Sequence, residues 1–432
     1  MDRRILVSDM VSTQSGDTAI HAPASVRGKE QRTLRAGYIP LMDAAILIVA
    51  AELGFAEREG LRLELVRDVT WANVRDRLAF RQFDIAHMLS PMPVASMLEL
   101  GSNPSPTIAP FCLGRGGNAI TLSARIFERM KSLTGLADDA DALANAKALA
   151  ALLADMRARG ETVPTLGMTY PFSSHNYEFR YWLAAGGIDP DRDVKLVVVP
   201  PPLTSDALAA GAIDGFCVGA PWNMIASERG TGRIVAAKQD IWPLAPEKVL
   251  GMRPDWADAN ADTVSRLIVA LDRAARWCDD PAHHNELAEI LSGPEYIAAP
   301  TSIIRRVLNG EFSLDAQGTK RVVPDYFLFH RGAANHPRPD QASWIYSQML
   351  RWGQADFSVE GMTNARSAFR PDLYLEALGQ GAALPDEARE KGDGGYEGFM
   401  DGKRFDPDDV QAYVERFPVR SSLSSRPRIS DS

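Results

Sequence analysis

Residues 33–68, TLRAGYIPLMDAAILIVAAELGFAEREGLRLELVRD, decide the fold. The first eight and the last eight residues of this stretch are strand-like. Between them, DAAILIVAAELG has the character of a helix, with Asp43 as its N-cap and Gly54 as its stop. A strand, a helix and a second strand in this order are typical of a βαβ unit. The stretch therefore predicts a parallel sheet with helices packed on it.

The same alternation continues along the chain. A helix is predicted over 70–80, with Thr70 as its cap, and a strand over 83–89. A second series of strands and helices covers 165–222, and a long helix over 261–278 follows it. Two such series predict an α/β fold of two lobes, with a ligand crevice between the carboxyl ends of their strands.

Changes in composition along the chain suggest where these lobes begin and end. Residues 1–31 are polar and aperiodic, so we expect a flexible N-terminal arm. We assign 32–115 to the first lobe, 116–243 to the second, and 244–377 to a helical segment that returns to the first. From 378 to 432 we expect a C-terminal extension that is loose and partly disordered.

The composition excludes several classes of protein. A net charge of -9, without any run of lysines or arginines, disfavours direct nucleic-acid binding. Cys112, Cys217 and Cys278 lie too far apart for a zinc or redox motif, so we expect no metal site there and buried thiols in a reducing compartment. No apolar run is long enough to span a membrane.

The N-terminal sequence MDRRILVSDM bears on location. The apolar run after Arg4 stops at Ser8, whereas a secretory signal needs roughly 7–15 apolar residues before its cleavage site. On this ground the sequence predicts a cytoplasmic protein.

Two nucleotide-binding motifs are also disfavoured. GRGGNA at 114–119 has the glycine spacing of a dinucleotide fingerprint, and Asp138 follows about 20 residues later. The next residues are strand-like, however, so no helix N-terminus is offered to a pyrophosphate. The chain also has no phosphate-binding loop of the G-x-x-x-x-G-K-[ST] type. No cofactor is expected.

Three residues could belong to a binding site, although each also has a structural interpretation. His175 follows Ser173 and Ser174 at a predicted helix entrance, where an anion would be favoured, but a solvated or hydrogen-bonded histidine fits as well. Trp71 begins the helix after Thr70 and could be a hydrophobic staple. Lys248 could be a surface lysine. The residues themselves leave these alternatives open.

Several ordered blocks of the sequence resemble the nitrate and bicarbonate solute-binding family of ABC transporters, from about residue 34 to beyond 350. The blocks are AGYIPLMDAAILIVAAELGFAEREGL, TWANVRDRLAF, DIAHMLSPMP, GNAITLS, SSHNYEFRYWLAAGGIDPDRDVKLVVVPPP, DGFCVGAPWN and IWPLAPEKVLG. The resemblance implies a two-lobed fold like that of the periplasmic binding proteins of type II, which closes on a small planar oxyanion.

The resemblance also implies the role of individual residues. Trp71 matches a tryptophan that walls the anion, and Asn118 matches an amide donor. His175 matches the histidine at the helix entrance, Gly219 a backbone contact, and Lys248 the lysine that neutralises the anion. Directed donors and one cation can replace the hydration shell of nitrate, while an aromatic face excludes water.

Two positions bear on the choice of ligand and on closure. Family members that resemble bicarbonate binders carry an acidic residue in place of Lys248 and recruit a metal ion, so nitrate or nitrite is favoured here. Ala220 is a departure, because transport members commonly have glutamate at that position. A missing carboxylate would bear on the geometry of closure.

The absent export signal, taken with the resemblance, favours one branch of the family. The chain most resembles the NasS-type cytoplasmic nitrate and nitrite sensors, which hold an RNA-binding antiterminator of the ANTAR class (NasT-like) inactive until the anion binds. The resemblance thus implies a sensor whose partners are nitrate or nitrite and this antiterminator, with no membrane partner.

Two other classes of function compete with the sensor. The chain could be the substrate-binding component of a nitrate ABC transporter, which is the main alternative. An enzyme is disfavoured, because the thiamine-pyrimidine synthases that share this architecture carry a cysteine-rich iron motif without counterpart here, and no catalytic triad spacing is visible.

Overall fold

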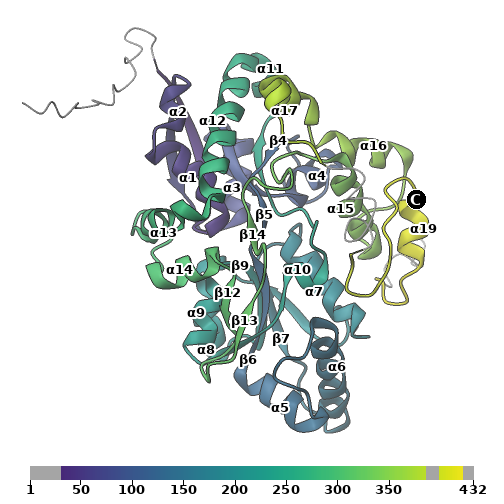
Figure 1. Cartoon of the computed structure of the whole chain (residues 1–432). Helices are drawn as coiled ribbons and strands as arrows, with labels where there is room; N and C mark the ends of the chain where they lie inside the picture. Colours follow the sequence, from purple (N-terminus) through teal and green to yellow (C-terminus); the bar gives the residue numbers. More distant parts are fainter. Residues whose placement is uncertain (1–30, 386–397, 422–432) are drawn as a thin grey trace, which may run out of the picture. The chain divides into compact units, whose positions relative to one another are not determined.

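The computed structural model describes residues 31–385 and 398–421, and Figure 1 shows their arrangement. The predicted N-terminal arm lies, except for Gln31, outside the described residues. So do the last eleven residues of the predicted C-terminal extension and its segment 386–397.

The first sheet contains five strands in the order β2-β1-β3-β11-β4. Strand β1 is parallel to both β2 and β3, which confirms the predicted βαβ unit, whereas β11 is antiparallel to both of its neighbours. The strands are β1 (Arg32–Tyr38), β2 (Leu61–Arg67), β3 (Ile85–Leu89), β4 (Ile108–Cys112) and β11 (Lys248–Met252). The helices between the first four are α1 (Ala45–Glu52), α2 (Phe55–Arg58), α3 (Trp71–Ala79) and α4 (Pro91–Met97).

Asp43 is not the N-cap of the first helix, and that prediction was wrong. Asp43 lies inside a 3-10 turn, η1 (Met42–Ala44), and α1 follows without a side-chain cap. Its buried carboxylate accepts from Lys248 Nζ at 2.8 Å and pairs with His87 Nε2 at 2.9 Å. A buried carboxylate is stabilised more by a cation than by a backbone N–H, and these partners come from distant strands that the local sequence does not reveal.

The second sheet also contains five strands, in the order β10-β6-β9-β7-β8. Strand β7 is parallel to β8 and β9, whereas β6 is antiparallel to β9 and β10. The strands are β6 (Asn118–Ser123), β7 (Thr165–Met168), β8 (Lys195–Val198), β9 (Gly215–Gly219) and β10 (Gly232–Ala237). The helical elements of this lobe are α5 (Ala124–Thr134), α6 (Ala142–Ala158), α7 (Ser174–Ala185), η2 (Pro201–Leu203), α8 (Thr204–Ala209), α9 (Trp222–Glu228) and α10 (Lys238–Ile241).

The predicted cap at Thr70 is confirmed, and of the two serines before His175, either of which could cap the next helix, Ser173 is the cap. The Thr70 hydroxyl accepts from the backbone N–H of Asn73 at the start of α3. At the start of α7, the Ser173 hydroxyl accepts from the N–H of Asn176. Each cap fixes where its helix begins, and so places the next side chains of the first turn.

The segment after β11 is mainly helical, and part of it packs on the second lobe. Helix α1 contacts α12 (Ala261–Asp279), which also contacts α17 (Pro371–Leu378) (Figure 1). The hairpin of β12 (Glu311–Ser313) and β13 (Lys320–Val322) instead contacts helices of the second lobe. Ser227 Oγ of α9 donates to the Ser313 carbonyl at 2.6 Å, and Arg321 pairs with Asp240 of α10 at 2.7 Å. The predicted assignment of all of 244–377 to a helical part of the first lobe therefore differs from the structure here. The elements are α11 (Pro254–Ala259), α12 (Ala261–Asp279), η3 (Pro281–His283), α13 (His284–Ser292), α14 (Thr301–Leu308), β12 (Glu311–Ser313), β13 (Lys320–Val322), β14 (Phe327–Leu328), α15 (Pro339–Arg351), α16 (Val359–Ser367), α17 (Pro371–Leu378) and η4 (Gly379–Gly381).

The described end of the chain, 398–421, is packed rather than loose, which corrects the prediction for that segment. The Phe399 ring stacks on Trp242, with their centroids 4.6 Å apart, and Asp401 accepts from the Tyr181 hydroxyl at 2.7 Å. Helix α19 (Val410–Glu415) adds the buried ring of Tyr413. Aromatic side chains separated by polar residues gave no regular period, so the sequence did not predict this packing.

The glycines of GRGGNA lie where the chain passes over a few residues from the first sheet to the second. Strand β5 (Arg115–Gly116) pairs with β14, and β6 begins at Asn118, so a strand follows the motif as predicted. Gly116 has φ +90°, and a Cβ there would lie only 1.9 Å from the Tyr326 carbonyl oxygen. The motif is thus explained by backbone conformation and close approach.

We expect Gly116→Ala to lower the free energy of unfolding by about 2 kcal/mol, because alanine is strained at this φ and its methyl group meets backbone. Denaturant titration measures the loss. Gly135→Ala is the matched control, since Gly135 also has positive φ, but a Cβ added there would meet no atom within 4 Å. Equal losses in the two variants would show that steric contact at Gly116 contributes nothing.

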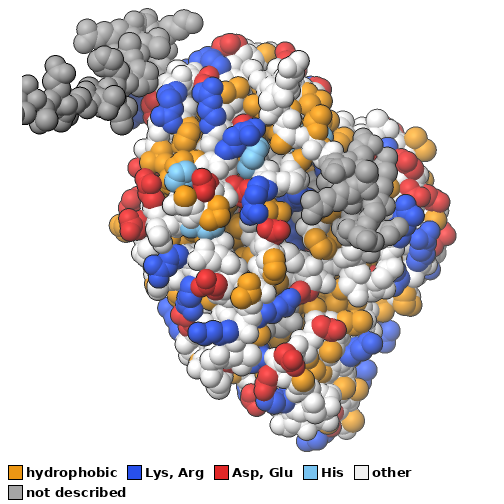
Figure 2. Space-filling model, in the orientation of Figure 1, with side chains coloured by type: hydrophobic (Ala, Val, Ile, Leu, Met, Phe, Trp, Pro, Cys, Tyr) orange, Lys and Arg blue, Asp and Glu red, His pale blue; other side chains and the backbone are white. Residues whose placement is uncertain are grey.

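The surface carries mixed charge. On the face shown in Figure 2, basic and acidic side chains are interspersed over both lobes and no single-sign field stands out. Among the described residues, no helix combines the length and the hydropathy that a membrane span requires. Cys112, Cys217 and Cys278 are buried and unpaired, as predicted.

Candidate functional site

Lys248 is the first residue of β11, and its side chain is completely buried. Besides the bond to Asp43, its ammonium group contacts the carboxylate of Glu247 and lies 5.7 Å from the centre of the Trp71 ring. Burial alone would lower the pKa of Lys248, but Asp43 and Glu247 outweigh that effect and raise it. The surface-lysine interpretation is therefore wrong, and the site holds a permanent cation.

Glu247 joins the two lobes at this point. Its backbone belongs to the first sheet, because its carbonyl accepts from the N–H of Ser90 at the end of β3. Its carboxylate reaches the second lobe, where it accepts from Lys238 Nζ at 3.0 Å and from the Asn118 amide. Burial alone would raise the pKa of Glu247, but the two neighbouring lysines outweigh it and lower the pKa to about 2.

His175 lies in the first turn of α7 and is completely buried, so it is not a solvated histidine. Its Nδ1 lies 3.0 Å from the Thr169 hydroxyl, and its Nε2 lies 3.7 Å from the Glu247 carboxylate. Burial and the charge of Lys248 lower the pKa of His175 to about 3, so the ring is neutral at pH 7. When the Thr169 hydroxyl donates to Nδ1, Nε2 carries the proton and faces the centre of the site.

Asn118 and Gly219 come together because they are register partners on β6 and β9. The Asn118 amide donates to Glu178 at 3.0 Å as well as to Glu247. A Cβ on Gly219 would lie 3.3 Å from the Asp43 carboxylate and 3.5 Å from the Asn118 side-chain oxygen. Glycine therefore leaves room for the backbone of β9 to approach the charged cluster.

Trp71 is the first residue of α3 and is buried beside the same cluster. Its ring meets the His87 ring edge to face, with centroids 5.2 Å apart. Within the part of the chain that the structure describes, neither Trp71 Nε1 nor His175 Nε2 has a hydrogen-bond partner. A buried donor without an acceptor lowers the stability of the folded chain, so two of them beside the same cluster call for an explanation.

Glu178 and Lys238 complete the cluster on the side of the second lobe. Glu178 Oε1 lies 3.7 Å from Lys238 Nζ, and both side chains are buried. Burial raises the pKa of Glu178 to about 7, against the opposing effect of Lys238. Near neutral pH this carboxyl group therefore holds its proton part of the time.

The structure thus brings all five predicted site residues to one buried place between the sheets. The sequence prediction missed five others that share it, namely Asp43, His87, Glu178, Lys238 and Glu247. Glu178 could have been found from its place one helical turn after His175, on the same face of α7. Glu247 could have been found from its position beside Lys248.

Ala220 contributes its backbone to the contact between the lobes. Its carbonyl accepts from the N–H of Met42 at 3.2 Å, and its own N–H donates to the Gly117 carbonyl at 2.7 Å. The position at which this chain has alanine, where transport members of the family commonly have glutamate, therefore lies where the two lobes contact each other.

The charged cluster brings together groups that can donate to a small anion, although Asp43, Glu178 and Glu247 contact several of them. Two lysines, an amide and two ring N–H groups converge on it, and an aromatic wall excludes water. Across residues 31–385 and 398–421, no group of three or more metal-ligating side chains is suitably placed to hold a metal ion.

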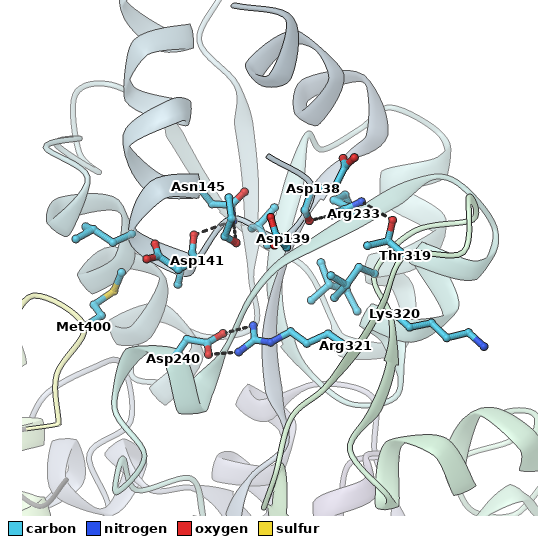
Figure 3. Close-up of a pocket in the computed structure, with 16 residues that line it drawn as sticks. Asp138, Asp139, Asp141, Asn145, Arg233, Asp240, Thr319, Lys320, Arg321 and Met400 are labelled. Atoms are coloured by element: carbon cyan, nitrogen blue, oxygen red, sulfur yellow. Dashed lines mark hydrogen bonds and ion pairs between the residues drawn. The ribbon is translucent and has the colours of Figure 1, made fainter. Parts of the chain in front are cut away.

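A pocket of about 470 Å³ lies elsewhere, in the second lobe. Figure 3 shows its lining, in which Asp240 and Arg321 face each other and Asn145 comes from the first turn of α6. This pocket shares no residue with the charged cluster. Asp240 and Arg321 of its lining pair with each other, and Asp138 and Arg233 pair with Lys131 and Asp315 outside it. The convergent donors, rather than this pocket, indicate where a small anion would bind.

Comparison with known proteins agrees with this geometry. Residues 27–292 match the model of the NMT1-like family. The chain is 36% identical to the nitrate import ATP-binding protein NrtC of Synechocystis over 92% of its own length, but it spans only 57% of that relative. It is 31% identical to the nitrate/nitrite binding protein NrtA of Synechococcus elongatus, over 93% of this chain and 90% of that one.

A solved structure resembles the chain over most of its length. The crystal structure of the periplasmic nitrate-binding protein NrtA from Synechocystis matches with a TM-score of 0.79 and 28% identity. The match covers 90% of this chain and 99% of that one. It confirms the predicted α/β fold of two lobes, of the kind found in periplasmic binding proteins.

Proposed function

Because the chain belongs to the NMT1-like family, among its nitrate and bicarbonate binding proteins, we propose that it binds nitrate or nitrite between its two lobes. We further propose that it does so as the solute-binding part of an ABC-type transport system. The relatives described above are named for nitrate binding or nitrate import, which supports this role over others.

One observation supports the proposed ligand most strongly. Two buried N–H donors without acceptors, on Trp71 and His175, lie beside the buried cation of Lys248. A flat anion with several acceptor oxygens would pair with donors that come from both lobes. Each of the five predicted site residues lies where it could play the role that the family resemblance implies for it.

The charge of Lys248 favours nitrate or nitrite over bicarbonate. The resemblance implies that bicarbonate binders carry an acidic residue at this position and recruit a metal ion. Here the position holds a buried cation, and the described residues offer no metal cluster. A monoanion that brings no metal fits this arrangement best.

A cytoplasmic sensor that releases an antiterminator of the NasT-like, ANTAR class stays a prediction. No relative described above is named as a sensor or for an RNA-binding partner. Cytoplasmic location likewise stays a prediction. A binding protein needs no catalytic group, and we propose no reaction for this site.

Titration calorimetry tests the proposed ligand. We expect heat from nitrate or nitrite with the purified protein, and much weaker binding of bicarbonate. His175→Ala should weaken nitrate binding about tenfold, since the variant loses one hydrogen bond to a charged ligand. His175→Gln should retain part of the affinity, because its amide can still donate.

The control for these variants is His284→Ala, which removes a half-buried histidine of α13 that contacts Asn309 and none of the cluster residues. Equal nitrate affinity in wild type, His175→Ala and His175→Gln would return His175 to a purely structural role. No heat with any of the three anions would contradict the proposed function.

A further inference from the structure

Glu247 holds a second role that the family resemblance does not assign. We propose that its carboxylate is an internal competitor for the anion site, which ties the lobes together in the unliganded chain and must leave its donors when an anion binds. This inference rests on the proposed function, because it concerns the same donors.

The geometry places this carboxylate where the ligand's donors converge. One oxygen contacts Lys248 and lies 3.7 Å from His175 Nε2. The other accepts from the Asn118 amide and from Lys238 Nζ. A carboxylate is flat and singly charged and carries two acceptor oxygens, which makes it close to nitrite in shape and charge. Three of the five residues predicted to bind the anion thus face a group of the protein that resembles it.

The charge balance argues that the two anions exclude each other. Lys238 and Lys248 carry two positive charges within the buried cluster, and Asp43 and Glu247 carry two negative charges, to which Glu178 adds a third when it is ionised. A further anion beside an unmoved Glu247 would add an uncompensated buried charge, which is strongly unfavourable. An anion that takes over the donors of Glu247 leaves the charge of the cluster unchanged while that carboxylate moves toward water.

The same carboxylate connects the lobes. Glu247 is anchored to β3 by its backbone, whereas Asn118 and Lys238 belong to the second lobe. Glu178 accepts from the same Asn118 amide and lies near the same lysine, but it comes from α7 of that lobe. Glu178 therefore provides a matched comparison, because its contacts to Asn118 and Lys238 tie no lobes together.

Calorimetry with sodium nitrate tests the competition. Glu247→Gln keeps the shape of the side chain but removes its charge, so we expect nitrate to bind about tenfold more tightly than to wild type. Glu64→Gln, at an exposed position on β2, is expected to leave the affinity unchanged. Unchanged or weaker binding in Glu247→Gln would overturn the proposal, since it would show that Glu247 supports the anion's donors.

A distance measurement tests the tie between the lobes, first without ligand and then with nitrate. Spin labels at Arg62→Cys and Lys195→Cys mark exposed positions on β2 and β8, one in each lobe, and the three native cysteines are buried. Without nitrate, we expect a short distance in the labelled wild type and in Glu178→Gln. We expect a longer or broader distribution in Glu247→Gln, which nitrate then shortens.

The two measurements separate the possible failures. If the wild-type distance is long without nitrate and shortens with it, the proposed tie is wrong even when Glu247→Gln does not fold. If nitrate, nitrite and bicarbonate bind neither wild type nor Glu247→Gln, the proposed function fails and the competition fails with it. A longer distance in Glu247→Gln would then still establish the tie between the lobes.

Discussion

Replacing Lys248 by methionine is expected to abolish measurable nitrate binding and to lower the free energy of unfolding by about 3–5 kcal/mol. Methionine keeps most of the volume but removes the cation that contacts Asp43 and Glu247. Both carboxylates are completely or almost completely buried, so each loses compensation that water cannot replace. Calorimetry measures the first effect, and denaturant titration the second.

Lys147→Met is the control for this variant, because it makes the same change at an exposed position of α6. It should alter neither nitrate affinity nor stability measurably. If Lys248→Met kept the affinity of wild type, Lys248 would have to be removed from the proposed anion site. If only the stability fell, the ion pairs would be structural and the ligand would bind elsewhere.

Acid is expected to destabilise the protein through His175. The pKa of this ring is lowered to about 3 in the folded chain, whereas an unfolded histidine has its ordinary value near 6.5. The neutral ring therefore contributes stability that is fully present above pH 6.5 and is lost as the pH falls toward 3. For this buried group the loss is on the order of 4 kcal/mol.

His175→Gln isolates that contribution, because glutamine does not titrate. The stability of wild type minus that of the variant should fall by on the order of 4 kcal/mol between pH 7 and pH 3. Glu247, with its pKa lowered to about 2, loses its contribution only below about pH 4.5, and Glu178 acts in the opposite direction, but both are present in the two proteins. A difference independent of pH would show that the pKa of His175 is not lowered in the folded chain.

Local sequence patterns predicted the two sheets well, but they did not predict how the segments after residue 310 pack against the second lobe. The βαβ stretch, the caps at Thr70 and Ser173 and the strand after GRGGNA depend on neighbouring residues, so the sequence displays them. The hairpin β12–β13 and the packed ring of Phe399 depend on partners far along the chain. Neither has a regular apolar period, and so neither could be predicted from spacing.

The site residues also divide into those that the local sequence reveals and those that depend on distant partners. Trp71, His175 and Lys248 were found because each stands at the start of an element in a block that resembles a known family. Asp43 was misread, because an aspartate before an apolar helix is a common cap. Its partner Lys248 follows about 200 residues later, and only the fold brings the two together.

The chain passes from the first sheet to the second over 113–117 and returns over 238–247, and these crossings have a consequence for how such proteins diverge. Asn118 and Lys248 are each the first residue of the strand that follows a crossing. A substitution there changes what faces the ligand, while the register of the strand behind it is fixed by backbone bonds. Preference for one anion or another can therefore shift by mutations at strand starts without a change of strand register, but at Lys248 the buried carboxylates of Asp43 and Glu247 must change with it. Relatives named for nitrate and for bicarbonate, at equal identity to this chain, are the outcome expected from such an arrangement.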